Sequence, residues 1–153
     1  MYNAVSGNDK IYMYWSPNVD TSSEPVSPWW PGKEYTDIVG LDYYPSADEG
    51  LPDFATAYGS FIETYAIPNR LPFAIGETGT ILSNQGSASV AQREQWLKNI
   101  LNPDQGFGSY SQYYISCTWF EYGPPGNPTF WVVYDQSTST ISETISNTEN
   151  GSA

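Results

Sequence analysis

The stretch Pro72-Phe73-Ala74-Ile75-Gly76-Glu77-Thr78-Gly79 decides the predicted fold. It predicts a short strand over Phe73 to Ile75 that is apolar on both faces, as in a parallel sheet covered by helices on both sides. One carboxylate, Glu77, follows this apolar run. A charged group beside a buried strand is costly to place, and catalytic residues of βα barrels lie at the C-terminal ends of strands. Glu77 is therefore the leading candidate for a catalytic group; the alternative is a carboxylate that caps a helix or accepts loop amides.

Outward from this stretch, the chain alternates between strand-like runs and helical periodicity. Apolar residues recur at steps of three and four over Leu51 to Ala66, which predicts an amphipathic helix. Ser89-Val90-Ala91-Gln92 has the form of a capping box and predicts the start of a second helix, which Asn102-Pro103 ends. Strands are predicted over Ile11 to Trp15, Ile38 to Leu41, Phe73 to Ile75 and Tyr113 to Phe120. This order indicates an α/β fold with parallel strands.

The predicted strands all end in polar or aromatic residues. These ends are Trp15 to Asn18, Asp42-Tyr43, Glu77 and Trp119 to Glu121. Functional residues that lie together at one edge of a parallel sheet are typical of βα barrels and of open α/β sheets. No glycine-rich phosphate loop follows any of these strands, which disfavours a nucleotide-binding open sheet.

Length and composition fit one folded domain. We expect a single domain over residues 1–153, with its core at about 10–135 and a polar tail at 136–153. Within the core, the apolar segment Phe130 to Asp135 is predicted as a strand or a hairpin arm. Ile141 and Ile145 lie four residues apart in the tail, which fits at most a short terminal turn.

Charge excludes several classes of function. Five Lys and Arg against 17 Asp and Glu give a formal net charge of −12. Such a field repels phosphate backbones and anionic lipid, so nucleic acid and membrane surfaces are not expected partners. With no His in the chain, a His-based catalytic triad and a His metal site are excluded, and no residue pattern implies a metal or a cofactor. The single Cys117 lies in an apolar run and is expected to be a buried thiol.

Aromatic residues make up 16% of the chain, with 13 Tyr and 6 Trp. Tyr and Trp combine a flat apolar face with a polar tip, which suits ligands such as sugars. Trp29 and Trp30 stand together in a proline-rich loop. They form either a cover over the core, which we favour, or an exposed stacking surface.

Four segments carry a resemblance to a known family. They are Trp15-Ser16-Pro17-Asn18; Trp30-Pro31-Gly32 with Thr36-Asp37-Ile38-Val39-Gly40-Leu41-Asp42-Tyr43-Tyr44; Pro72 to Gly79; and Cys117-Thr118-Trp119-Phe120. In order and spacing they resemble the C-terminal half of a clan A retaining glycoside hydrolase, most similar to the family 26 mannanase type. The resemblance implies a (β/α)8 TIM-barrel fold, of which this chain would hold strands five to eight.

The same resemblance implies roles for individual residues. Glu77, at the end of strand seven, would be the nucleophile that attacks a β-linked hexose such as mannose. Trp119, at the end of strand eight, would form the floor of the sugar subsite, and Tyr43 or Tyr44 would shape the same cleft. The other residues expected to bind substrate are Trp15, Asn18 and Asp42.

The resemblance leads us to expect that the second carboxyl group needed for this chemistry is missing from this chain. Retaining hydrolysis uses two carboxyl groups about 5–5.5 Å apart. In the clan, the acid/base glutamate ends strand four, which would precede Met1, and a full barrel takes about 250 residues. We therefore expect the chain to be a fragment. Glu121 and Asp42 are the alternative acids within it.

Two other classes stay open. A carbohydrate-binding module would use Trp29, Trp30, Trp119 and Trp131 as a stacking platform, although such modules are usually all-β. An inactive half-barrel or interaction protein would expose two sheet edges, so we expect self-association or pairing with a missing N-terminal half. The resemblance suggests secretion, although no signal-like apolar segment lies near Met1.

Overall fold

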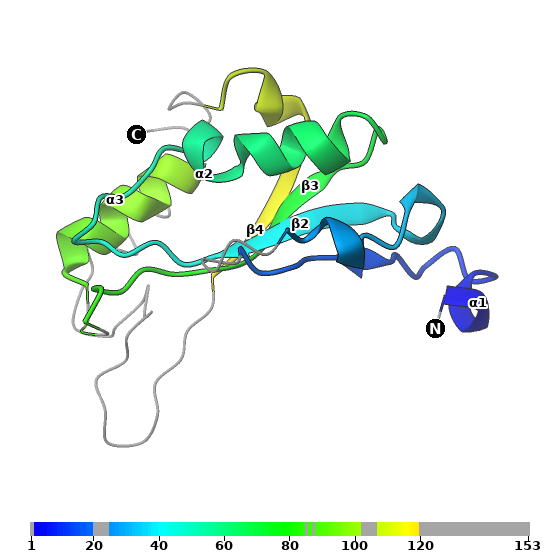
Figure 1. Ribbon diagram of the computed structural model, residues 1–153, viewed down its shortest axis with the longest axis horizontal. Helices are drawn as coiled ribbons and strands as arrows, with labels where there is room; N and C mark the ends of the chain where they lie inside the picture. Colours follow the sequence, from blue (N-terminus) through cyan, green and yellow to red (C-terminus); the bar gives the residue numbers. More distant parts are fainter. Residues whose placement is uncertain (1, 20–24, 85, 87, 102–106, 120–153) are drawn as a thin grey trace.

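A computed structural model of the chain describes residues 2–19, 25–84, 86, 88–101 and 107–119. Its centre is a parallel four-stranded sheet in the order β1-β2-β3-β4 (Figure 1). The strands are β1 (Tyr14–Trp15), β2 (Ile38–Tyr43), β3 (Phe73–Thr78) and β4 (Tyr114–Trp119). The predicted α/β class with parallel strands is confirmed. The predicted segment at 130–135, the tail and Glu121 lie outside the described residues.

All four strands differ from their predicted bounds: β2 extends past Leu41 to Tyr43 and β4 begins at Tyr114, and the other two differ as follows. β1 begins at Tyr14 and not at Ile11, and Ile11 and Tyr12 are exposed. β3 runs on to Thr78, so Glu77 lies inside the strand and not after it. The strand can accommodate a carboxylate there because Gly76 and Glu77 are both half-buried, whereas Phe73 to Ile75 before them and Thr78 after them are buried.

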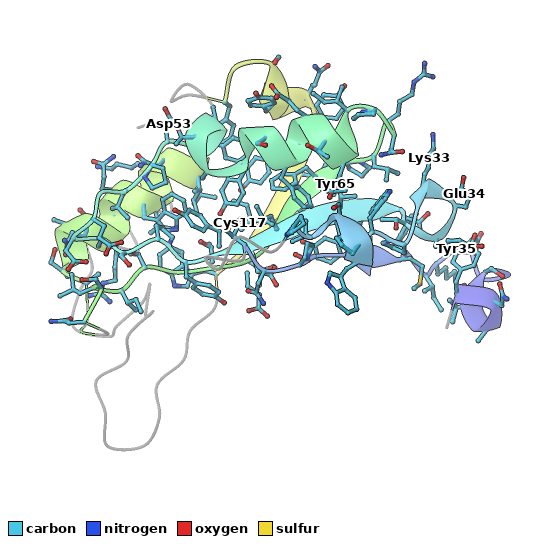
Figure 2. All side chains as sticks on the ribbon, in the orientation of Figure 1. Lys33, Glu34, Tyr35, Asp53, Tyr65 and Cys117 are labelled. Atoms are coloured by element: carbon cyan, nitrogen blue, oxygen red, sulfur yellow. The ribbon has the colours of Figure 1, made fainter. Side chains whose placement is uncertain are left out.

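The two long helices follow from local sequence signals. α2 (Phe54–Phe61) begins where the side chain of Asp53 accepts a hydrogen bond of 2.7 Å from the backbone N–H of Thr56; Figure 2 shows Asp53 at the start of this helix. It continues as a π-helical turn, η3 (Ile62–Ala66). α3 (Val90–Leu101) starts at the predicted capping box, which is confirmed because the backbone N–H of Gln92 donates to Ser89 Oγ and that of Ser89 to Gln92 Oε1.

Four shorter helical elements complete the described residues. They are α1 (Tyr2–Val5), η1 (Ser27–Trp29), η2 (Lys33–Tyr35) and η4 (Gly108–Gln112). None of the helices in the described part of the chain has the length and apolar character needed to cross a bilayer.

The core lies between the sheet and the helices α2 and α3, on one face of the sheet (Figure 1). Strand residues Val39, Phe73 and Ile75 are fully buried there. Aromatic side chains from several elements close the core, with ring centroids of Tyr58 and Phe73 at 5.5 Å and of Phe54 and Phe107 at 4.1 Å. Each such buried ring contributes about 1.5–3 kcal/mol relative to an exposed one.

The opposite face of the sheet carries small residues instead of helices. Gly40, Ala74 and Gly76 alternate with the core-facing positions, and Tyr14 from β1 lies across Gly40. The Tyr14 hydroxyl donates a hydrogen bond of 3.3 Å to the carbonyl of Ala74. The expectation of helices on both faces is wrong for the described residues, because a neighbouring strand's ring, and not a helix, covers this part of the sheet.

Candidate functional site

A β-bulge in β3 sets the direction of Glu77. Between paired positions, β2 has the single residue Asp42 where β3 has two, Gly76 and Glu77. The same extra residue appears against β4, because Ile75 pairs with Cys117 and Thr78 with Trp119. A bulge of this kind bends the strand and re-aims side chains, and bulges are over-represented beside active sites.

The consequence follows from strand alternation. In a regular strand Glu77 would share the core-facing side with Ile75. The extra residue instead places Thr78 on that side, where it is fully buried and its Oγ1 accepts a hydrogen bond of 2.9 Å from Trp96 Nε1. Glu77 is thereby released from the core and remains half-buried near the carboxyl end of the sheet.

Tyr44 is the direct partner of Glu77. Its hydroxyl donates a hydrogen bond of 2.7 Å to Glu77 Oε2. Burial, this hydrogen bond and the charges of Glu77 and Asp42 all raise the pKa of Tyr44 well above its usual value. The phenol therefore stays protonated over the physiological range and remains a donor to the carboxylate.

Asp42 is a second carboxyl group at the same edge. Ser16 Oγ donates a hydrogen bond of 2.6 Å to Asp42 Oδ1. Burial is the largest influence on Asp42 and raises its pKa; the Ser16 hydrogen bond opposes this, and the charge of Glu77 adds to it. The site thus holds two carboxyl groups on neighbouring strands, Glu77 with a tyrosine hydroxyl as donor and Asp42 with a serine hydroxyl as donor.

Gly76 is required by this arrangement. A Cβ at Gly76 would collide with Ser16 Oγ and Asp42 Oδ1 and come within 2.8 Å of Ser16 Cβ. The Ser16–Asp42 pair therefore lies directly over the backbone of β3. A glycine inside a strand often marks such a close approach.

The structure brings some of the predicted site residues together and separates others. Asp42 and Tyr44 join Glu77, and Asn18 forms an isolated parallel bridge with Asp42. Between the alternatives Tyr43 and Tyr44, only Tyr44 reaches Glu77 through its side chain among the contacts described. Tyr43 points to the core, with its ring 6.1 Å from that of Tyr58 and 6.0 Å from that of Trp96.

Two predicted aromatic residues lie on the helix side. Trp15 contacts Trp30, at 4.8 Å between centroids, and Tyr65, at 4.9 Å. Trp119 is half-buried and packs against Leu97 of α3. The adjacent tryptophans Trp29 and Trp30 differ in burial, since Trp30 packs against Trp15 and the core whereas Trp29 is 76% exposed.

Several residues at the site have roles that the sequence did not indicate. The sequence indicated Ser16 only as part of the strand end Trp15 to Asn18, and it indicated no role for Thr78 or Thr80. The sequence did contain one signal: Gly40 in β2 and Gly76 in β3 are glycines inside strands, which indicate that another group approaches the backbone closely.

Cys117 is not a nucleophile at this site. It lies between the sheet and the helices (Figure 2), paired in register with Ile75. Burial raises the pKa of its thiol to about 12, so it stays neutral at physiological pH. In the described part of the chain no group of three or more His, Cys, Asp or Glu residues is placed to hold a metal ion.

Comparison with known proteins gives structural neighbours. No protein-family model matches the chain, and no curated protein matches it. An exo-beta-agarase matches with a TM-score of 0.57 and 18% identity, over 99% of this chain and 22% of its own. The catalytic domain of the GH26 endo-beta-1,4-mannanase of Bacillus sp. JAMB-750 matches with a TM-score of 0.45 and 22% identity, over 76% and 31%. Bacillus subtilis mannanase BCman matches with a TM-score of 0.41 and 24% identity, over 78% and 30%.

The similarity to the exo-beta-agarase concerns the fold alone. The agarase match extends over nearly the whole chain and shows that the two share the fold of the parallel sheet and its helices. This chain spans less than a third of each of these structures.

Proposed function

We propose that this chain is the nucleophile-bearing part of a retaining glycoside hydrolase that acts on a β-linked polysaccharide of the β-mannan type. The observation that carries the proposal is the placement of Glu77. A bulge at the end of the central strand β3 turns this carboxylate out of the core, and the Tyr44 hydroxyl binds its Oε2 at 2.7 Å. Catalytic residues at the carboxyl ends of parallel strands are the rule in βα barrels.

In the proposed reaction, Glu77 attacks the anomeric carbon of the sugar. A bond forms between Glu77 Oε1 and that carbon as the glycosidic bond breaks, and the leaving oxygen keeps the electron pair. Water then cleaves the glycosyl–enzyme ester. The hydrogen bond from Tyr44 occupies Oε2 and so orients the other oxygen toward the sugar.

A second carboxyl group must protonate the leaving oxygen. We propose that a segment outside this chain supplies it and that β1 to β4 correspond to strands five to eight of a (β/α)8 barrel. Asp42 is the other carboxyl group near Glu77 in the described residues; its Oδ1 accepts a hydrogen bond from Ser16 and burial raises its pKa, so Asp42 is the alternative acid within this chain. Asp42 and Asn18 are proposed to contact sugar, and no cofactor is proposed.

A substrate with a good leaving group tests the nucleophile without the acid. Dinitrophenolate needs little protonation to leave, so a dinitrophenyl β-mannoside should release it from the wild-type chain. Glu77→Gln should abolish this release. Glu63→Gln is the matched control, because Glu63 also accepts a hydrogen bond from a tyrosine, Tyr110, at 2.6 Å but lies on the helix side. If Glu77→Gln still releases dinitrophenolate, Glu77 is not the nucleophile.

A polysaccharide panel tests the substrate class. Because the proposed acid lies outside this chain, binding of the wild-type chain and Glu77→Gln to β-mannan, β-glucan, xylan and agarose is compared by affinity electrophoresis. Agarose is included because one structural neighbour is an exo-beta-agarase. Preference for agarose over mannan would contradict the proposed substrate class but not the assignment of Glu77 as the nucleophile. Retention on mannan in affinity electrophoresis, without any release of dinitrophenolate from the dinitrophenyl β-mannoside, would favour a carbohydrate-binding protein.

A further inference from the structure

Two buried threonines hold the backbone on either side of Tyr44. Thr78 Oγ1 donates a hydrogen bond of 2.7 Å to the carbonyl of Tyr43. Thr80 Oγ1 donates one of 2.8 Å to the carbonyl of Pro45. Both threonines are 0% exposed. The residue between the two carbonyls is Tyr44, the hydrogen-bond donor to Glu77.

This arrangement restricts the direction of the Tyr44 side chain. The carbonyl of Tyr43 belongs to the peptide plane that enters Tyr44, and the carbonyl of Pro45 belongs to the plane that leaves Pro45. The proline ring fixes φ of Pro45, which limits rotation between Tyr44 and that second plane. Fixing both leaves little freedom for the Cα–Cβ direction between them. The β-branched threonine side chains are themselves stiff, so each hydroxyl is a firm point of attachment. A hydrogen bond of 2.7 Å from the end of a long tyrosine weakens steeply with displacement.

The neighbouring loop is joined to the same segment. The backbone N–H of Ala47 donates to the carbonyl of Ile81 at 2.7 Å, and Ser46 forms a parallel bridge with Ile81. Asp48 accepts hydrogen bonds from the N–H and Oγ of Ser83. The chain after β3 is therefore attached to the chain after β2 at successive points, and Thr78 and Thr80 are the attachments nearest to Tyr44.

We propose that Thr78 and Thr80 are positioning residues that hold the Tyr44 hydroxyl on the Glu77 carboxylate. They act through the backbone of the Tyr43 to Pro45 segment and do not touch the reacting atoms. The catalytic consequence rests on the proposed function, whereas the structural consequence, the Tyr44–Glu77 hydrogen bond, does not.

Thr80 is the better residue to change. Thr78 Oγ1 also accepts from Trp96 Nε1, so its removal would leave a buried indole N–H without that acceptor. Thr80→Val removes a hydroxyl and keeps the shape, and Thr80→Ser keeps the hydroxyl. Thr36→Val is the matched control, because Thr36 is also buried and its Oγ1 has no hydrogen-bond partner among the described residues.

The direct readout is the hydroxyl proton of Tyr44 in an NMR spectrum at neutral pH. A hydroxyl that donates to a carboxylate exchanges slowly with water and resonates downfield; Tyr44→Phe assigns the signal by its loss. We expect the signal to be lost in Thr80→Val and retained in Thr80→Ser and Thr36→Val. A signal of wild-type position and intensity in Thr80→Val would overturn the proposal, as would its absence from the wild-type chain. If Thr80→Val does not fold, Thr80→Ala carries the same comparison.

The catalytic readout uses release of dinitrophenolate from the dinitrophenyl β-mannoside. We expect the rate constant to fall about fivefold in Thr80→Val, the equivalent of about one hydrogen bond, and to recover in Thr80→Ser. An unchanged rate constant would overturn the positioning role in catalysis. If no variant releases dinitrophenolate while the hydroxyl signal still responds to Thr80→Val, the proposed function fails and the positioning of Tyr44 stands.

Discussion

Replacing Gly76 by alanine tests the geometry of the site most sharply. The new Cβ would collide with Ser16 Oγ and Asp42 Oδ1, and Ser16 Cβ would lie 2.8 Å away. Forcing a methyl group into such a space costs about 1–3 kcal/mol, and breaking a hydrogen bond to a charged group costs about 1.5–3 kcal/mol. Alanine recovers about 0.4–1 kcal/mol by restricting the unfolded chain.

The net expectation is a loss of about 2–4 kcal/mol in the free energy of unfolding, a large part of the usual 5–15 kcal/mol. Urea unfolding followed by circular dichroism measures it; with a slope of about 1–3 kcal/mol per molar, the midpoint should fall by about 1–2 M. Gly7→Ala is the control, because a Cβ at Gly7 meets nothing within 4 Å, and it should change stability by less than about 0.5 kcal/mol.

A double variant identifies the cause of the loss. Ser16→Ala removes one of the two colliding atoms, so the losses from Gly76→Ala and Ser16→Ala should not add. If Gly76→Ala is as mild as Gly7→Ala, or if the two losses add, the Ser16–Asp42 pair does not lie over β3 and the reasoning is refuted.

Three further predictions concern the same region. Tyr44→Phe removes the donor to Glu77 Oε2 and should slow dinitrophenolate release about tenfold, with the wild-type rate as the contradicting result. The pKa of Asp42 is raised in the folded state, so its contribution to stability is present at low pH and is lost as pH rises through that pKa. The difference in free energy of unfolding between Asp42→Asn and wild type should therefore favour Asp42→Asn more at pH 7 than at pH 3. An equal difference at both pH values would contradict this prediction. Because the Cys117 thiol has a pKa of about 12, it should react with a disulfide reagent at pH 8 far more slowly in the folded chain than in urea.

The sequence predicted the elements of the fold better than the directions of their side chains. Hydrophobic periodicity and the Ser89–Gln92 capping box placed α3, and apolar runs placed the strands, because these signals are local. The bulge at Gly76 and Glu77 could not be predicted, since it is a property of three strands in register. Without the bulge, alternation alone would turn Glu77 toward the core.

The aromatic residues show the same limit. Trp15, Tyr43 and Tyr44 all end predicted strands, and nothing in the local sequence distinguishes a ring that packs under α2 from one that reaches a carboxylate. Alternation across β2 decides between Tyr43 and Tyr44, but only once Asp42 is known to face Ser16. Trp29 and Trp30 differ for a similar reason: Trp29 is the last residue of η1 and is exposed, whereas the backbone becomes extended at Trp30, whose ring contacts Trp15.

The central claim is that Glu77 is a nucleophile, and covalent trapping tests it most directly. A dinitrophenyl β-mannoside with fluorine in place of the hydroxyl next to the anomeric carbon forms a glycosyl ester that hydrolyses slowly. The account predicts one added sugar per chain by intact mass, located on Glu77 by peptide mapping, present in Glu63→Gln and absent from Glu77→Gln. No adduct, or an adduct on another residue such as Asp42, would contradict it.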